Sequence, residues 1–231
     1  MRISIVIPVL DEAQTIGPLL QYLFDHGREQ ILEILVVDGG STDGTGSIAE
    51  QSGATVLQCG VRSRAAQMNL GARHAQGDML YFIHADTCPP ASFASDIEAS
   101  LAAGYVMGCY RYRFDSSSVL LKINAFFNRF KWLWCQGGDK TFYIQREVFQ
   151  QLGGYDEYYT IMEEYDFLRR AMPLYPLHII PKYAVVSARK YENNSWLRVQ
   201  YANALVFRLF RKGASPEQMK KTYTSIVRRE S

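Results

Sequence analysis

Acidic side chains follow three of the four apolar segments in the first 90 residues of this 231-residue chain. Asp11 and Glu12 come directly after the first segment, Asp38 ends the second, and Asp86 follows the last. In a parallel α/β sheet, ligands bind beyond the carboxyl ends of the strands. Carboxylates that gather at one edge repel one another unless they hold a cation or accept hydrogen bonds. The spacing indicates a cation-assisted ligand site, with helix capping by Asp38 and Asp43 as the alternative.

The tripeptide His84-Ala85-Asp86 contains two possible metal ligands. In extended backbone, residues i and i+2 point to the same face. A carboxylate with an imidazole suits Mg²⁺ or Mn²⁺ that already carries a diphosphate. A structural histidine is the alternative. Arg62 and Arg64 stand at the start of a predicted helix, where arginines and free N–H groups favour phosphate.

One glycine pattern resembles a dinucleotide site but argues against a dehydrogenase. Residues 44–49 match the G-x-G-x-x-A fingerprint. The match begins seven residues past the end of the preceding strand, not in the tight turn that the mechanism needs. The next strand ends in Gln58, which is not an acid that could bind a ribose.

Apolar periodicity predicts an alternating order of strands and helices in the first half of the chain. Strands are expected at 3–7, 31–37, 54–57 and 79–84, separated by helices at 13–25, 45–51 and 64–75. This order predicts an α/β fold with a mostly parallel central sheet and helices on both faces. In the second half we expect strands at 105–114, 142–144, 177–180 and 183–187, and helices at 163–172, 195–211 and 216–228.

Composition and charge indicate where the protein is located and what kind of partner it binds. The four cysteines match no zinc spacing, and no stretch of about twenty apolar residues predicts a membrane span. A reduced, cytoplasmic protein is therefore expected. Residues 187–231 carry ten basic and three acidic side chains, whereas 15 basic and 20 acidic side chains precede them. This asymmetry indicates an anionic partner for the tail or a solvated helix face.

The segment 119–135 combines aromatic and basic residues at near-helical spacing. Lys122, Arg129 and Lys131 lie among phenylalanines and tryptophans, as in helices that lie at a membrane interface. Contact with an anionic membrane surface is one interpretation, and a core or homodimer interface is the other. Nucleic-acid binding is not expected, because no motif supports it.

Several ordered motifs resemble those of family 2 glycosyltransferases of the GT-A fold. They lie at Pro8–Glu12, Val36–Thr45, Gly77–Thr87, Gly153–Glu157 (G-G-[FY]-x-E) and Met162–Asp166 (M-E-D-x-[DE]). Further matches at 64–69, 84–87, 187–192 and 215–217 resemble a bacterial subgroup, the radical-SAM/selenodomain-associated transferase 2 proteins. The resemblance implies a catalytic domain at 1–192, with a nucleotide-sugar-binding half at 1–90 and an acceptor half at 91–192. A basic helical extension follows at 193–231.

The resemblance also implies an activity and its residues. The expected reaction is inverting hexosyl transfer from a nucleoside-diphosphate sugar, expected to be UDP-linked, with Mg²⁺ or Mn²⁺. Glu164 is the implied general base with Glu163 as the alternative, and Asp86 with His84 the implied metal ligands. The implied donor site comprises Pro8, Leu10, Glu12, Asp38, Arg64, Ala85 and Asp86, and the implied acceptor site Asp139 and Trp134.

Two positions depart from the family pattern. His84 replaces the first acid of a D-x-D motif, and Glu164 is one methylene longer than the usual Asp. The acceptor is left open, a lipid-linked compound included. The alternative function is a non-catalytic nucleotide-sugar-binding or membrane-associated scaffold protein of the same fold. A nucleotidyltransferase would need a Gly- and Lys/Arg-rich loop after the first strand, which residues 8–15 do not provide.

Overall fold

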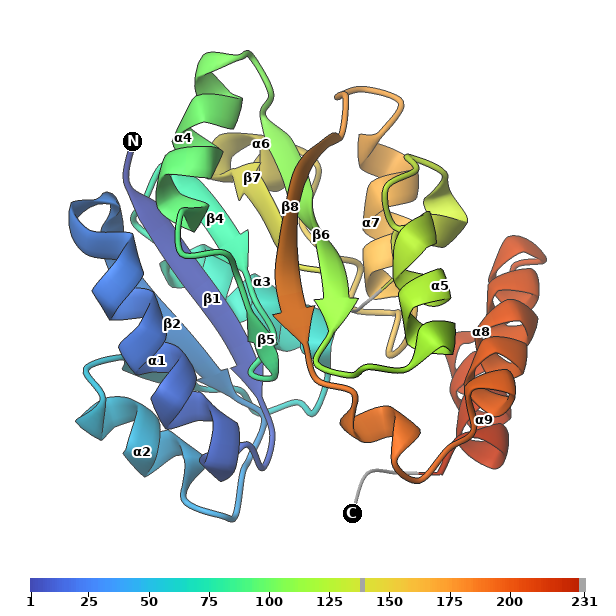
Figure 1. Cartoon of the computed structure of the whole chain (residues 1–231). Helices are drawn as coiled ribbons and strands as arrows, with labels where there is room; N and C mark the ends of the chain where they lie inside the picture. The colour runs from blue at the N-terminus through green and yellow to red at the C-terminus, as the bar shows by residue number, and fades with distance from the viewer. Residues whose placement is uncertain (138–139, 229–231) are drawn as a thin grey trace.

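A mixed eight-stranded sheet in the order β3-β2-β1-β4-β7-β6-β8-β5 forms the centre of the molecule (Figure 1). The computed structural model describes residues 1–137 and 140–228. Four parallel strands form one half, namely β1 (Ile3–Val9), β2 (Ile31–Asp38), β3 (Thr55–Gln58) and β4 (Met79–Phe82). The other half contains β7 (Phe142–Gln145), β6 (Met107–Phe114), β8 (His178–Val186) and β5 (Thr87–Cys88). Here β6 and β8 are parallel, while β7 and β5 are antiparallel to their neighbours.

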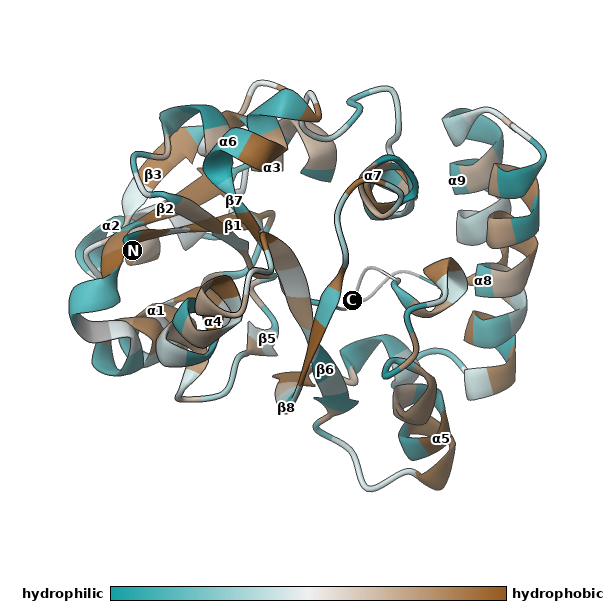
Figure 2. Ribbon diagram, turned by 90° about the horizontal axis from the view of Figure 1, so that it is seen from above, coloured by the Kyte–Doolittle hydropathy of each residue, from teal (hydrophilic) through white to brown (hydrophobic). Residues whose placement is uncertain are grey.

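Helices cover both faces of this sheet. Figure 2 shows α1 (Ala13–Gly27) and α4 (Phe93–Ala102) on one face, and α3 (Arg64–His74) and α6 (Arg146–Gln151) on the other. The remaining helices are α2 (Thr45–Gln51), α5 (Val119–Phe127), α7 (Glu163–Ala171), α8 (Trp196–Arg211) and α9 (Pro216–Ile226). Short 3₁₀ turns lie at Arg28–Gln30 (η1), Leu133–Cys135 (η2) and Arg189–Tyr191 (η3). The predicted α/β architecture is confirmed.

Burial on both faces explains why β1 is a continuous apolar run. All seven of its residues are buried. Ile5 and Ile7 pack in the core under α1 and α4, whereas Val6 packs on the opposite face with α3. Pro8 has no N–H to donate, and it lies beyond the last pair that β1 makes with β4, Val6 with Phe82. The strand therefore accommodates a proline next to its carboxyl end.

Several expected boundaries are wrong. The strand expected at 79–84 ends at Phe82, and the two strands expected at 177–180 and 183–187 are the single strand β8. Pro181 and Lys182 interrupt the apolar pattern there, and the pairing with β6 shifts register at the same place. The helices α4 and α6 were not predicted. The aromatic segment 119–135 is helical only to Phe127 and in the short turn η2.

The C-terminal helices α8 and α9 form a hairpin at the end of the molecule away from α1 and α2 (Figure 1). Val206 and Phe210 of α8 and Met219 of α9 are buried together with Met162, which precedes α7. The hairpin is therefore anchored by apolar packing next to the predicted catalytic segment. The expected division at residue 192 stays a prediction.

Candidate functional site

The loops that follow β1 and β2 are tied to each other by hydrogen bonds. Asp11 has a left-handed backbone with φ of 55°. Its Oδ1 accepts a hydrogen bond from the Thr42 amide at 2.8 Å, and its own amide donates to Ser41 Oγ at 3.0 Å. The Glu12 amide donates to Thr45 Oγ1 at 2.8 Å. The two strand ends therefore form one preorganised rim.

Asp38 and Asp43 are both engaged by nearby backbone. Asp38 is buried, and its Oδ1 accepts hydrogen bonds from the Gly40 amide at 3.0 Å and from the Ser41 amide and hydroxyl at 2.8 and 2.7 Å. Asp43 Oδ1 accepts from the Thr45 amide at 3.0 Å, at the first residue of α2. Asp43 therefore binds the start of α2 from the position before the N-cap residue, which is Gly44. These contacts hold Asp38 through Oδ1 at the carboxyl end of β2.

The buried amide of Gln67 joins the two strand ends from beneath. Its Nε2 donates to the carbonyl oxygens of Val9 at 2.9 Å and Val37 at 2.8 Å. Both carbonyls lie where their strands end, and an unpaired buried carbonyl would be costly. Gln67 therefore fixes the spacing of the loops that carry Asp11 and Asp38.

Residues 84–86 form a turn and not the extended segment that we expected. The Thr87 amide donates to the His84 carbonyl at 3.0 Å, and residues 85 and 86 are in the turn. The geometric premise for a shared metal site, an i, i+2 pair in extended backbone, is therefore wrong. The Asp86 carbonyl accepts from the Ser187 amide at 3.1 Å, so this turn is held against the end of β8.

Asp86 and Glu12 converge on one guanidinium. Arg189 Nη2 lies 3.1 and 3.2 Å from the two carboxylate oxygens of Glu12 and 3.7 Å from Asp86 Oδ2. Sequence reasoning missed Arg189 as a site residue and counted it only as part of a motif and of the basic tail. The strand-end rule that selected Asp38 would have found it, because Arg189 follows β8 at the same edge of the sheet.

His84 faces the first turn of α7. Its Nε2 lies 3.4 Å from Glu164 Oε1, and both side chains are mostly buried. Burial alone would lower the pKa of His84, but the hydrogen bond and negative charge of Glu164, with the charge of Asp86, raise it overall. The structure therefore brings the predicted base Glu164 to the turn that carries Asp86.

Glu163 lies in a different environment from its neighbour. Its side chain is 1% exposed, whereas that of Glu164 is 16% exposed. Arg64 Nε of α3 lies 3.0 Å from Glu163 Oε1, outside hydrogen-bond geometry, and neither carboxylate oxygen has a hydrogen-bond partner among the described residues. Burial, together with the charge of Glu164, raises the pKa of Glu163 in spite of Arg64. Glu163 is thus a buried carboxyl that joins α3 to α7.

The other predicted site residues are spread more widely. Pro8 is buried, Leu10 is exposed at the rim, and Ala85 is buried in the turn before Asp86. Trp134 is half-exposed and stacks on Trp132, and it lies in the turn η2, which contacts α7. Asp139 lies outside the described residues.

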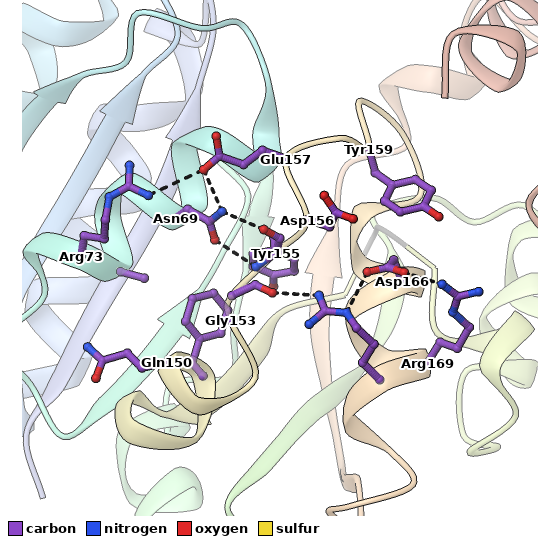
Figure 3. Close-up of a pocket in the computed structure, with 14 residues that line it drawn as sticks. Asn69, Arg73, Gln150, Gly153, Tyr155, Asp156, Glu157, Tyr159, Asp166 and Arg169 are labelled. Atoms are coloured by element: carbon purple, nitrogen blue, oxygen red, sulfur yellow. Dashed lines mark hydrogen bonds and ion pairs between the residues drawn. The ribbon is translucent and has the colours of Figure 1, made fainter. Parts of the chain in front are cut away.

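A cleft of about 770 Å³ lies between α3, α7 and the loop before α7 (Figure 3). The polar side chains that line it bind one another and hold these segments together. Asn69 donates to the Tyr155 carbonyl at 2.8 Å and to Glu157 at 2.9 Å. Asp166 accepts from Arg169 and Arg170 at 2.7 and 2.9 Å. Its charges neutralise one another, and none of the predicted donor or catalytic residues lines it.

The carboxylates at the strand ends suit a hard divalent cation only in part. In the described ranges 1–137 and 140–228, no group of three or more His, Cys, Asp or Glu side chains could hold a metal ion. Mg²⁺ is often bound by one or two carboxylates together with substrate phosphates. Asp86 and Glu12 already share the guanidinium of Arg189, so a cation at this edge would share their oxygens with Arg189.

Two solved glycosyltransferases have a fold similar to that of this chain. The mannosyltransferase PcManGT from Pyrobaculum calidifontis, in complex with GDP-Man and Mn²⁺, has a TM-score of 0.69 at 21% identity, covering 97% of this chain and 68% of that one. Glucosyl-3-phosphoglycerate synthase from Mycobacterium tuberculosis, in complex with Mn²⁺, UDP and glucosyl-3-phosphoglycerate, has a TM-score of 0.64 at 20% identity, covering 92% and 80%. These likenesses show that the fold is GT-A-like.

The sequence comparisons give the family. Glycosyltransferase AglJ of Haloferax volcanii is 33% identical over 104 residues, which are 45% of this chain and 33% of AglJ, so the match spans about a third of that relative's length. The model of the family described as glycosyl transferase family 2 matches residues 4–166, which is more than half of the chain. The chain therefore belongs to glycosyl transferase family 2.

Proposed function

We propose that this protein is an inverting glycosyltransferase that moves a hexosyl group from a nucleoside-diphosphate sugar, expected to be UDP-linked, to an acceptor hydroxyl. The observation that carries the proposal is the 3.4 Å contact between His84 and Glu164. It ties a carboxylate able to act as a base to the turn that carries Asp86. Asp86, the proposed anchor for the donor diphosphate, and Glu164, the proposed base for the acceptor hydroxyl, therefore lie close together, as glycosyl transfer requires.

The rim of the β1 and β2 loops is the proposed nucleotide site. Asp38 is held through Oδ1, so its orientation is fixed before a nucleobase arrives. Pro8, Leu10 and Glu12 would line the same rim, and Arg64 would lie near the base or the phosphates. Two neighbours of similar fold were solved with GDP-Man and with UDP, which supports a nucleoside-diphosphate donor without choosing the base.

Asp86 is the proposed anchor for Mg²⁺ or Mn²⁺, with His84 as the predicted second ligand. A bound cation would neutralise charge on the departing nucleoside diphosphate. His84 Nε2 lies 3.4 Å from Glu164 Oε1, so in this proposal the imidazole mainly orients the base. Arg189 would place a fixed positive charge beside the diphosphate, because it already contacts both Glu12 and Asp86.

Glu164 is the proposed general base. It would take the proton from the acceptor hydroxyl as the oxygen attacks the anomeric carbon on the face opposite the diphosphate, which inverts the configuration. Glu163 is less suitable because it is 1% exposed and beside Arg64, where an acceptor hydroxyl does not reach it. The assignment of Asp139 and Trp134 to the acceptor site stays a prediction. Membership of the radical-SAM/selenodomain-associated subgroup and a cytoplasmic location also stay predictions.

Isothermal titration calorimetry tests the donor site. UDP and GDP would be titrated into the wild-type protein and into Asp86→Ala, each with and without Mn²⁺. We expect one nucleotide to bind more tightly with Mn²⁺, and we expect Asp86→Ala to lose that gain. Glu98→Ala, which removes an exposed carboxylate of α4, is the matched control. Equal affinity of wild type and Asp86→Ala under all conditions would refute the assignment of Asp86.

A further inference from the structure

An exposed apolar surface extends from α5 to the turn η2. We call it the α5 aromatic surface. Its members are 39–67% exposed, namely Val119, Leu120, Ile123, Phe126, Phe127, Trp132 and Trp134. Figure 2 shows hydrophobic residues along α5 at the periphery of the molecule. A contiguous apolar surface of this kind marks an interaction site more often than a neutral part of a protein surface.

The aromatic rings of this surface form one connected array. Phe126 and Phe127 have ring centroids 5.7 Å apart, and Phe127 lies 5.8 Å from Trp134. Phe130 stacks on Trp132 at 4.9 Å, and Trp132 stacks on Trp134 at 5.7 Å. The helix and the turn therefore present their rings together and not as isolated exposed residues.

The charged residues within the segment that forms this surface are all basic, and the exposed Asp115 precedes that segment. Residues 116–137 contain Lys122, Arg129 and Lys131 and no acidic residue. A groove of about 290 Å³ beside α5 is lined by Arg113, Lys122 and Arg129 together with apolar side chains, and no carboxylate lines it. The Arg129 guanidinium lies 3.9 Å from the centre of the Phe126 ring. Cations next to exposed rings suit an anionic, partly apolar partner.

A buried polar network holds this segment in place. Lys140 Nζ donates to the Asn128 carbonyl and to Gln136 Oε1, both at 2.7 Å. Asn128 Nδ2 donates to the Tyr112 carbonyl of β6 at 2.8 Å, and Gln136 also donates to the Phe130 carbonyl. The backbone that carries the rings is thus anchored to the sheet, so the surface is preformed and binding needs no refolding.

We propose that the α5 aromatic surface docks this protein on a bilayer that contains anionic phospholipids. Phenylalanine, tryptophan and aliphatic side chains enter the interface, while the groove with Arg113, Lys122 and Arg129 receives lipid phosphates. No helix in the described part of the chain is long and apolar enough to cross a membrane, so the contact is peripheral. The proposal does not depend on the proposed transfer reaction.

Two other occupants fit the surface less well. In a two-fold dimer the same patch meets itself, which brings the cations of two copies together without acids to pair them. Single-stranded nucleic acid stacks on rings next to cations, but the aliphatic side chains Val119, Leu120 and Ile123 offer it no stacking face. The bilayer interface accommodates aliphatic, aromatic and basic side chains together.

Vesicle binding by the full-length chain tests this proposal. The protein would be sedimented with vesicles of phosphatidylcholine alone and with vesicles that also contain phosphatidylglycerol. We expect binding only to the anionic vesicles, weakened by added salt, with tryptophan emission shifted to shorter wavelength as Trp132 and Trp134 leave water. Phosphatidylcholine vesicles that bind equally well would overturn the role of charge.

Variants separate the α5 aromatic surface from the basic tail. Lys122→Glu/Lys131→Glu should lower the partition coefficient at least about tenfold, because it removes two cations from the anionic surface. Trp132→Ser/Trp134→Ser should also lower it at least about tenfold, because it removes two indole rings from the bilayer interface. Circular dichroism melts would confirm that the variants remain folded. Lys220→Glu/Lys221→Glu on α9 is the matched control and should bind like the wild type. An equal loss in that control would place the contact on the tail and refute the proposal.

Sedimentation velocity and a competition assay test the other occupants. A wild-type dimer that Trp132→Ser/Trp134→Ser converts to monomer would assign the surface to self-association. A single-stranded oligonucleotide that displaces the protein from anionic vesicles, with its own binding lost in the same variant, would assign it to nucleic acid. Either result overturns the lipid proposal, and monomeric protein without oligonucleotide binding supports it.

Discussion

The ends of β1 and β2 and the first turn of α7 hold their charged groups in different ways. At the strand ends, Asp38 accepts three hydrogen bonds from residues two and three positions along the chain. At α7, Glu164 meets His84 and Glu163 meets Arg64, partners that lie about 80 and 100 residues away in sequence. Asp38 is therefore held by a local turn, whereas the contacts of α7 exist only when α7 is docked on the rest of the fold.

This difference bears on how each region could function. The rim keeps its shape through hydrogen bonds of main-chain amides, both within the β2 loop and between the β1 and β2 loops, which suits recognition of a constant chemical group such as a nucleotide. Carboxylates held by distant partners depend on packing for their position and protonation. The comparison predicts that changes at α7 affect the chemical step, while changes at the rim affect donor binding.

Glu164→Gln is the change with the largest expected effect. Gln keeps the size and can still contact His84, but it cannot accept a proton from the acceptor hydroxyl. We expect the rate of nucleoside diphosphate release to fall by a factor of about 10² to 10⁴, which is the usual contribution of a general base. The affinity for the donor should not change. The measurement is the rate of nucleoside diphosphate release from sugar donors that carry the nucleotide identified by calorimetry, alongside the binding constant of that nucleotide.

Glu163→Gln is the matched control for that measurement, because it makes the same chemical change one residue earlier. It should keep most of the wild-type rate, since Glu163 is buried against Arg64. If Glu163→Gln loses the rate and Glu164→Gln keeps it, the base has been assigned to the wrong neighbour. A loss of donor affinity in Glu164→Gln would instead show that the two regions are not separate in function.

Gly108→Ala should have the next largest effect, this time on stability. A Cβ at Gly108 in β6 would fall on the Tyr143 hydroxyl and on the His178 carbonyl of β8. Because a backbone atom is one of the obstacles, we expect a loss of about 1–3 kcal/mol in the free energy of unfolding. Urea denaturation measures it, with Gly60→Ala as control because a Cβ there meets no atom within 4 Å. Equal stability of the two variants would contradict the close packing of β6 on β8.

Local patterns were sufficient to predict the parallel strands β1, β2 and β4. The runs that form β1, β2 and β4 are apolar on both faces, so they stand out without knowledge of their neighbours. Their acids could be placed at one edge from topology alone. The exception is the turn at His84 and Asp86, where the chain leaves the sheet two residues earlier than the apolar pattern indicates.

The contacts between distant segments could not be predicted in the same way. Arg189 meets Glu12 across 177 residues, and only the return of β8 to the same edge brings them together. The burial of Lys140 could not be predicted either. A single lysine in the sequence does not indicate that its ammonium group donates to Asn128 and Gln136. Whether a charged residue is buried depends on packing that one sequence does not state.

Glu163→Gln also has the smallest expected effect, a change in how stability depends on pH. Burial and the charge of Glu164 raise the pKa of Glu163 in the folded protein above its ordinary value of 4.5. Below that value both folded and unfolded chains carry the proton, so the group has no effect on stability. As pH rises from there toward the folded pKa, the unfolded chain ionises first and the wild type loses stability. Gln stays neutral throughout and does not share this loss.

The stability of Glu163→Gln relative to wild type should therefore increase with pH across that window and then level off. Urea denaturation of both proteins at a series of pH values measures the difference directly. A difference that decreases with pH would mean that Arg64 stabilises an ionised Glu163, because a lowered folded pKa gives stability that is gained as pH rises. In that case the α3–α7 contact would be an ordinary ion pair, and burial would no longer distinguish Glu163 from Glu164 as the candidate base.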